Sequence, residues 1–460
     1  MAQIYKEGEI KVRPDVYYRY SNKGAAKTAA IDGINAIVMK APWGPIDEVR
    51  AFNDIEDIKA VYGTCIGTEA ATAILEEGAS KVYIYRTGGT GGAKASAKVG
   101  NVTVNAKYEG DYPLKIKIQK RPGDDTIKQC YVLINNGIKE SYNFTAGESD
   151  STELTKTLSA SDYVDVSDAS APEAVAETEV ELSGGKNPTV TAESYTKGFY
   201  ALEPYYYNVI SVDTIEDSIQ ELLAEYVNDA ARIGKFAISV LGADQTLSLS
   251  QRVNKAKSYN KEQIALIGNT YTHTDGTTAD MILSVARLAG AVSATPSNKS
   301  IVHRAIKNAS DIPEKFTNSQ YEEAIQGGVI LFSKSSDGQI WFDSGVTTLT
   351  ILDENQDAGW KKLKRTKVRN ELMHRLDLLL EKKVGRVNCD ADGLADVIQT
   401  GMGLLKDMAN ENKIMGNGAF ILDSANPATS DSAWFLIEVN DIDTLEKIYL
   451  HYRFSNVPTA

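Results

Sequence analysis

The sequence predicts an α/β core domain that is interrupted by an inserted β-rich domain and followed by an α+β C-terminal domain, with extended arms at both ends. Three observations lead to this fold class. Apolar runs typical of buried strands alternate with helical patterns in two stretches, residues 21–94 and 197–349. Residues 95–196 hold short alternating runs separated by turn signals. Residues 350–460 change again, to long helical patterns followed by strands.

Length and composition fit a globular protein of several domains. The chain has 460 residues, which corresponds to about three domains at roughly 150 residues each. Hydrophobic residues make up 42% and charged residues 24%, which is enough apolar material for full cores. The net charge of -13 argues against a nucleic-acid binder, because phosphate binding needs positive charge. The 23 tyrosines against 10 phenylalanines favour a protein with much half-exposed interface.

The N-terminal sequence and the cysteines indicate folding in a reducing cytosol. The first residues lack the apolar core of a signal peptide. The sequence contains no run of 18 apolar residues, so we expect neither a membrane span nor direct membrane insertion. Cys65, Cys130 and Cys389 lie far apart, so they fit neither a disulfide framework nor a CxxC site.

Residues 1–20 predict an extended arm rather than part of a core. Charged residues alternate with apolar ones, and Pro14 is tolerated mainly on edge strands. A disordered tail is the alternative; we expect an arm that pairs as a strand. The apolar residues at even spacing are Ile10, Val12, Val16, Tyr18 and Tyr20.

The first α/β stretch reads as strand, helices, strand. Residues 34–41 are a near-continuous apolar strand, and residues 81–86 are a second one. Between them we expect a helix from the cap Asn53 to Tyr62 and another from Thr68 to Gly78. This order implies parallel pairing of the two strands.

A glycine-rich segment at residues 87–94 opens the insertion and predicts a hinge. A phosphate-binding loop is excluded, because Ala93 stands where the second glycine is required and Ala95 follows Lys94. We expect strands at 99–104, 114–118 and 130–134. Residues 146–195 hold eleven acidic residues and two lysines, a net charge of −9 that predicts a solvated acidic surface.

The second α/β stretch repeats the alternation. Strands are expected at residues 209–212, 236–241 and 264–267. Asp213 is the expected cap of the first helix, and Ala279–Ala291 should form a later one.

The end of this stretch carries more local signals. Thr317 and Gln320 have the spacing of a capping box, and residues 329–332 and 339–342 flank a turn and predict a hairpin.

The C-terminal part is dominated by a basic segment. Residues 360–386 predict one long helix with ten Lys or Arg against three acidic residues, a net charge of +7 within an acidic chain. A solvated helix face is the simple interpretation, but this asymmetry indicates a partner with an acidic face, protein or nucleic acid. A second helix is expected at residues 394–410 and strands at 433–440 and 448–454.

No motif predicts chemistry. Residues 388–399 approach a calcium loop, but Gln399 replaces the required glutamate, so a helix-capping turn is the better interpretation. No HExxH, GxSxG or close Cys/His set occurs. We therefore expect no catalytic, cofactor or metal site.

Seven sequence blocks lie in order along nearly the whole chain: RPDVY (13–17), APWGP (41–45), EEGASKVYIYR (76–86), TNSQYEEAIQGGVIL (317–331), DSGVTTLT (343–350), KKVGRVN (382–388) and DTLEKIY (443–449). This ordered set resembles the tail sheath proteins of contractile phage tails and related injection particles. Asp15 stands where the family usually has Gly, and Ser344-Gly345 where Ile-Asn is common, which affects local turns only.

The resemblance implies two kinds of contact surface. Both termini should add strands to neighbouring subunits, and an inner domain should face a rigid inner tube through basic residues. The expected inter-subunit arms comprise the five N-terminal residues named above and Tyr449, His451, Arg453 and Phe454. The expected tube-facing residues are Lys361, Lys362, Lys364, Arg365, Lys367, Arg369 and Arg375.

The resemblance also implies the function and the partners. It implies a sheath subunit made in the bacterial host cytoplasm and built into a virion tail or a released, bacteriocin-like particle. Subunits should polymerise as a metastable helical tube of hexameric discs around the tail tube protein, contact baseplate and tail terminator proteins, and contract to drive the tube through a cell envelope. An α/β enzyme with a β-rich insertion and a monomeric adaptor are the alternatives.

Overall fold

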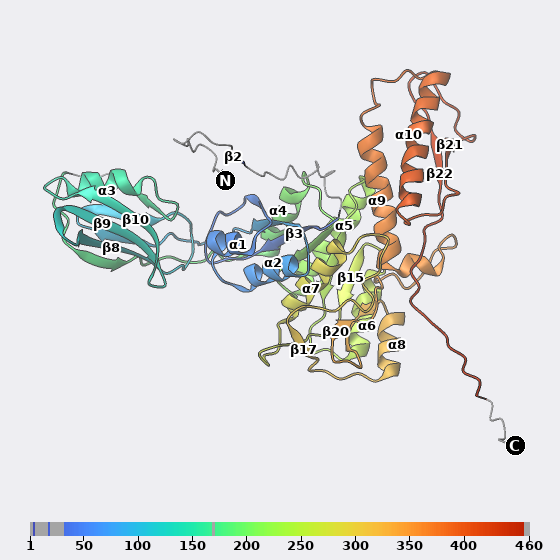
Figure 1. Ribbon diagram of the computed structural model, residues 1–460, viewed down its shortest axis with the longest axis horizontal. Helices are drawn as coiled ribbons and strands as arrows, with labels where there is room; N and C mark the ends of the chain where they lie inside the picture. Colours follow the sequence, from blue (N-terminus) through green and yellow to red (C-terminus); the bar gives the residue numbers. More distant parts are fainter. Residues whose placement is uncertain (1–2, 5–16, 19–31, 168–170, 455–460) are drawn as a thin grey trace. The chain divides into compact units, whose positions relative to one another are not determined.

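The computed structural model describes residues 3–4, 17–18, 32–167 and 171–454, which belong to two compact units divided between Ile31 and Asp32 (Figure 1). In the first unit, β1 (Gln3–Ile4) pairs in parallel with β2 (Tyr17–Tyr18). Tyr18 of the predicted arm therefore lies in a strand. The predicted arm residues outside the described ranges are Ile10, Val12, Val16 and Tyr20.

A seven-stranded sheet forms the core of the second unit. Its strand order is β18-β15-β14-β13-β3-β5-β4, and neighbours are parallel except for the edge strand β4. Segments on both sides of residues 95–196 thus contribute to one sheet. The strands are β3 (Ile34–Met39), β4 (Val49–Phe52), β5 (Lys81–Arg86), β13 (Val209–Val212), β14 (Ile238–Gly242), β15 (Ile264–Ile267) and β18 (Val329–Ile330).

Both faces of this sheet are covered, which explains the near-continuous apolar runs of its strands. Ile37 and Met39 of β3 join one core, and Ala36 and Val38 join the other, because alternate residues point to opposite faces. The first core is covered by α1 (Ile55–Tyr62), α2 (Ile66–Glu76) and α7 (Met281–Ala294). The second is covered by α4 (Ala192–Leu202), α5 (Asp217–Arg232), α6 (Leu249–Tyr259) and α8 (Asn318–Gln326).

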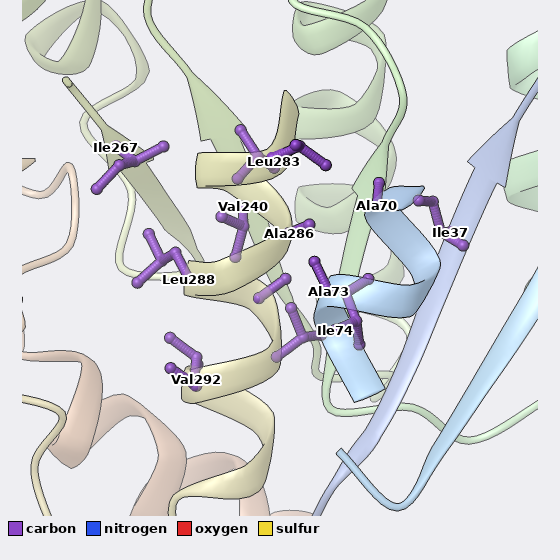
Figure 2. Close-up of a cluster of buried hydrophobic side chains, with 14 of the residues drawn as sticks. Ile37, Ala70, Ala73, Ile74, Val240, Ile267, Leu283, Ala286, Leu288 and Val292 are labelled. Carbon is purple, nitrogen blue, oxygen red and sulfur yellow. The ribbon is translucent and has the colours of Figure 1, made fainter. Parts of the chain in front are cut away.

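The helices α2 and α7 pack closely against each other on the first face. Figure 2 shows Ala73 and Ile74 of α2 beside Ala286 of α7, all of them buried. A Cβ on Gly290 of α7 would lie 2.6 Å from the carbonyl oxygen of Ile74. The small residues therefore set the distance between the two helices.

The helix starts correct three sequence predictions. Asp54, not Asn53, caps α1, and Cys65 precedes α2, because Thr68 acts inside the helix by bonding back to Cys65. Asp213 does not cap α5, which follows Glu216. The capping box of Thr317 and Gln320 at α8 is confirmed.

The predicted hairpin near residue 335 is confirmed only in part. Val329 and Ile330 join the large sheet as β18, and the hairpin proper consists of β19 (Phe332–Lys334) and β20 (Ile340–Phe342). A further short antiparallel pair consists of β16 (Thr272–His273) and β17 (Ala309–Asp311).

Residues 96–181 form two separate sheets around their own core. The predicted strand at 99–104 is two strands, because Gly100, with φ +61°, turns the chain between them. One sheet contains β6 (Ser96–Val99), β7 (Val102–Ala106) and β11 (Val164–Val166). The other contains β8 (Leu114–Arg121), β9 (Asp124–Ile134), β10 (Gly137–Thr145) and β12 (Thr178–Glu181), and α3 (Asp150–Leu158) also belongs to this segment.

The glycine-rich segment that begins this region is packed against the segment that ends it. Thr90 bridges to Thr189, and Ala93 bridges to Lys186. A Cβ on Gly89 would lie 2.1 Å from the carbonyl oxygen of Thr189. The glycine therefore allows the two connections to pair closely, and the hinge stays a prediction.

The C-terminal part contains a 3₁₀ helix, two long helices and a hairpin. The predicted long helix ends at Leu380 instead of Arg386, and residues 448–454 contain no strand. The elements are η1 (Ala358–Lys361), α9 (Leu363–Leu380), α10 (Ala391–Asn410), β21 (Ala419–Leu422) and β22 (Phe435–Glu438). Asp390 caps α10, as expected for a capping turn rather than a calcium loop. No helix in the described ranges has the length and hydropathy of a membrane span.

Candidate assembly surfaces

The basic helix α9 is the first candidate surface, and much of its charge is used inside the chain. Lys364 and Lys367 are buried, with 3% and 8% of their surface exposed. The Lys367 ammonium donates to the carbonyl oxygens of Val292, at 2.7 Å, and Thr295, and lies 3.5 Å from the Asp32 carboxylate. Burial lowers the pKa of Lys367.

The half-buried arginines of α9 pair with acidic residues that are distant in sequence. Arg369 lies 2.5 Å from Glu262. Arg375 lies 2.9 Å from Glu411. Lys361 donates to a backbone carbonyl, that of Thr350, at 2.7 Å. These contacts are intramolecular, so the tube-facing role of these residues stays a prediction.

Lys362 and Arg365 pair with the segment that follows β22. Arg365 makes a bidentate contact with Asp441, and hydrogen bonding to that carboxylate raises the pKa of Arg365. Lys362 lies 2.7 Å from Asp443 and 3.0 Å from Glu446. The sequence shows the charges but not these pairings, which join residues about 80 positions apart.

Lys364 is exceptional among these cations. Its ammonium has no hydrogen-bond partner among the described residues. Burial lowers the pKa of Lys364, although the nearby carboxylates of Asp443 and Asp441 favour the charged form. An unpaired buried ammonium costs stability.

Two basic residues that follow α9 have unpaired charge. Lys382 and Arg386 are exposed and make no ion pair or side-chain hydrogen bond within the described ranges. Their position just beyond the helix end distinguishes them from the paired residues of α9.

The C-terminal segment is the second candidate surface. All residues from Lys447 to Phe454 are exposed, with Tyr449 at 88% and Phe454 at 94%. The predicted arm residues Tyr449, His451, Arg453 and Phe454 are therefore together on one free segment. So many exposed large apolar side chains in one segment mark an interaction site.

The hairpin β21–β22 is a third surface, which the sequence analysis did not single out. It is a sheet of two strands with open edges in the described part of the chain. Large apolar side chains remain exposed on it: Ile421, Leu422, Trp434, Leu436 and Ile437. The signal was available in the apolar run of residues 434–437, but exposure depends on the tertiary structure.

A cavity of about 340 Å³ lies at the carboxyl ends of β3 and β13, between which the strand order reverses. Doubly wound folds often bind ligands there. Asp213 lines it, but its carboxylate already accepts from the Tyr195 hydroxyl at 2.5 Å and from the Lys40 amide at 2.7 Å. Burial raises the pKa of Asp213. Within the described residues, no group of His, Cys, Asp and Glu could hold a metal ion.

Comparisons with known proteins point to one family. Residues 189–348 match the family model described as the phage tail sheath protein central domain. Protein YqbK of Bacillus subtilis is 23% identical over 97% of this chain and 98% of its own length.

Solved structures share the fold over nearly the whole chain. A sheath tail protein from Desulfitobacterium hafniense has 19% identity and a TM-score of 0.74, covering 92% of this chain and 100% of its own. A sheath tail protein from Listeria innocua has 20% identity and a TM-score of 0.68, covering 89% and 95%. The contracted helical sheath of the anti-feeding prophage has 10% identity and a TM-score of 0.53, covering 96% and 99%. Residues 189–348 thus match the sheath central domain, and the fold of the whole chain is similar to that of contractile tail sheath proteins.

Proposed function

We propose that this chain is a contractile tail sheath subunit that polymerises as a helical tube around an inner tail tube and contracts to drive that tube through a target cell envelope. The observation that carries the proposal is the match to the sheath central domain within a sheath-like fold that spans the chain. Head-to-tail contacts that do not close into a ring produce such a helical polymer.

The proposal assigns a role to each part of the chain. Residues 21–94 and 197–349 form the core domain, 95–196 the outer insertion and 350–460 the inner domain. Residues 1–20 and the end of the chain serve as arms. The shared seven-stranded sheet and the separate core of residues 96–181 support this division.

The arms link neighbouring subunits by strand addition. The C-terminal segment from Lys447 has exposed backbone and apolar side chains, and β21–β22 has open edges of similar character. Strand addition would satisfy backbone groups on both partners and bury these side chains at about 1.5–3 kcal/mol for each large one. We therefore assign β21–β22 as an acceptor of an arm from another copy.

The sheath would also contact a tube, a baseplate and a terminator. The inner domain faces the tube, and Lys382 and Arg386 contribute unpaired positive charge to that contact. Exposed charge pairs contribute below about 1 kcal/mol each, so many of them hold the register yet release together. Baseplate and terminator proteins cap the two ends of this polymer of hexameric discs.

The extended sheath is kinetically trapped, and contraction moves subunits as rigid bodies that remain joined by their arms. Subunits are made in the bacterial host cytoplasm and become part of a phage tail or a released particle.

The direct test is electron microscopy of the purified full-length chain, alone and with its tube protein. We expect helical polymers or hollow tubes of constant diameter. A subunit that stays monomeric at 50.0 kDa at all concentrations, with and without the tube, would contradict the proposal.

A further inference from the structure

We propose that Lys362 and Arg365 form an ionic anchor that fixes residues 441–446, the root of the C-terminal arm, so that the free arm begins at Lys447. The anchor is a property of the single subunit. Its consequence for assembly rests on the proposed function, in which the free arm adds to a neighbouring copy.

The root carries three acidic side chains, and each contacts the anchor. Arg365 contacts Asp441 through two nitrogens, with Nε 2.6 Å from one carboxylate oxygen. Lys362 lies between Asp443, at 2.7 Å, and Glu446, at 3.0 Å. The pairs are partly buried, with side-chain exposures of 11% for Asp441 and 21% for Glu446, so water and salt screen them less than exposed pairs.

Hydrogen bonds that are not ion pairs also join the root to the rest of the subunit. The Ile442 amide donates to the carbonyl oxygen of Lys413 at 3.0 Å. The Ser300 hydroxyl donates to the second oxygen of Glu446 at 3.0 Å. The root is thus attached through its backbone and its side chains.

The attachment ends abruptly after Glu446. From Lys447 to Phe454 every residue is exposed, and no hydrogen bond or ion pair holds any of them to the other described residues. The apolar residues of this stretch have no core of their own, whereas the acidic root residues have cationic partners. The boundary between root and free arm therefore coincides with Glu446, the last acidic residue that meets a cationic partner.

The position of this boundary matters for strand addition. Releasing six residues would lengthen the free arm by up to about 20 Å and allow its register to slip. A slip by one residue turns every side chain of a strand to the opposite face. By holding the root, Lys362 and Arg365 act as positioning residues for the arm.

Hydrogen–deuterium exchange of the full-length subunit tests the anchor directly. The variants Lys362→Met and Arg365→Met should accelerate exchange of the Ile442 amide about tenfold, because the open state of the root becomes more populated. Lys382→Met removes the same charge from an exposed, unpaired site and should leave this exchange unchanged. The segment after Lys447 should exchange quickly in every variant.

A milder variant on the acidic side tests the same contact if the Met variants fail to fold. Asp443→Asn changes one atom group at a half-exposed site and should accelerate exchange of the root, while the double variant with Lys362→Met should add little to either change. Unchanged exchange of residues 441–446 in all these variants would overturn the anchor, even if the chain polymerises. Faster exchange in a subunit that never polymerises would support the anchor and contradict the proposed function.

Discussion

At the scale of single residues, the buried side chains of this protein do two opposite things. Trp43 is 2% exposed and packs against Tyr108, Tyr112 and Tyr163 of the insertion, with ring centroids 5.2, 5.3 and 6.3 Å away. Lys364 is similarly buried but pairs with nothing in the described structure. The contacts of Trp43 stabilise the fold, whereas the unpaired buried charge of Lys364 destabilises it.

Replacing Trp43 should destabilise the junction between core and insertion. We expect Trp43→Ala to lower the free energy of unfolding by about 3–5 kcal/mol, because it leaves a large cavity. Chemical denaturation followed by circular dichroism measures this loss. Trp434→Ala is the matched control, since Trp434 is 44% exposed and its removal should change the subunit's stability by less than about 0.5 kcal/mol.

Replacing Lys364 should have the opposite sign. Lys364→Met keeps the side-chain length and removes an unpaired buried charge, so the free energy of unfolding should rise by about 1–3 kcal/mol. Burial lowers the pKa of Lys364 in the folded state, so the unfolded chain binds this proton more readily. The wild type should therefore gain stability as the pH rises through that lowered pKa, and the advantage of the variant should shrink. A variant that melts lower than the wild type at neutral pH would contradict this account.

At the scale of elements, the position of a basic residue relative to helix α9 decides whether its charge is paired within the subunit or exposed. The basic residues of α9 other than Lys364 are paired within the subunit, whereas Lys382 and Arg386 follow the helix and are exposed. The hairpin β21–β22 shows the same contrast for apolar residues, since Phe420 is buried and Leu436 is exposed.

The two groups of basic residues can be compared in co-assembly with the tube. Lys382→Glu with Arg386→Glu should weaken co-assembly at moderate salt without changing the melting temperature, because only exposed charge is reversed. Lys362→Glu with Arg365→Glu should both weaken co-assembly and lower the melting temperature, because this variant breaks intramolecular ion pairs. Co-sedimentation and thermal melting separate the two effects. Undiminished co-assembly of the first variant would argue against a tube contact there.

The hairpin can be tested in the same way. Leu436→Asp should leave the subunit within about 0.5 kcal/mol of wild-type stability, because the side chain is 44% exposed. It should abolish polymers in negative-stain micrographs, since a charge would be buried at the arm contact. Normal polymers would exclude this hairpin as the acceptor.

At the scale of the whole molecule, assembly is predicted to depend on both ends of the chain. Deleting residues 1–20 or 447–460 should leave a folded subunit, because the Asp32–Ala460 unit has its own cores. Neither deletion variant should form tubes, as judged by electron microscopy beside the intact chain. Tubes from either variant would show that the deleted arm is dispensable.

Much of the core could be predicted from the sequence because its signals are local. Apolar runs such as residues 81–86 read directly as buried strands, and Thr317 with Gln320 specifies a helix start within one turn. The end of the basic helix could not be read from the charge pattern, which continues to Arg386, whereas the helix stops at Leu380. The strand expected at 448–454 is absent, because a strand needs a partner and the described chain supplies none.

The sequence by itself determined the alternation of strands and helices in the core, the parallel pairing of its first strands and the basic character of residues 360–386. Only the tertiary structure decided where that positive charge is used. Arg369 meets Glu262 across 107 positions, and Arg365 meets Asp441 across 76. Charge can be read from single residues, but an ion pair forms only where the fold brings two segments within a few ångströms.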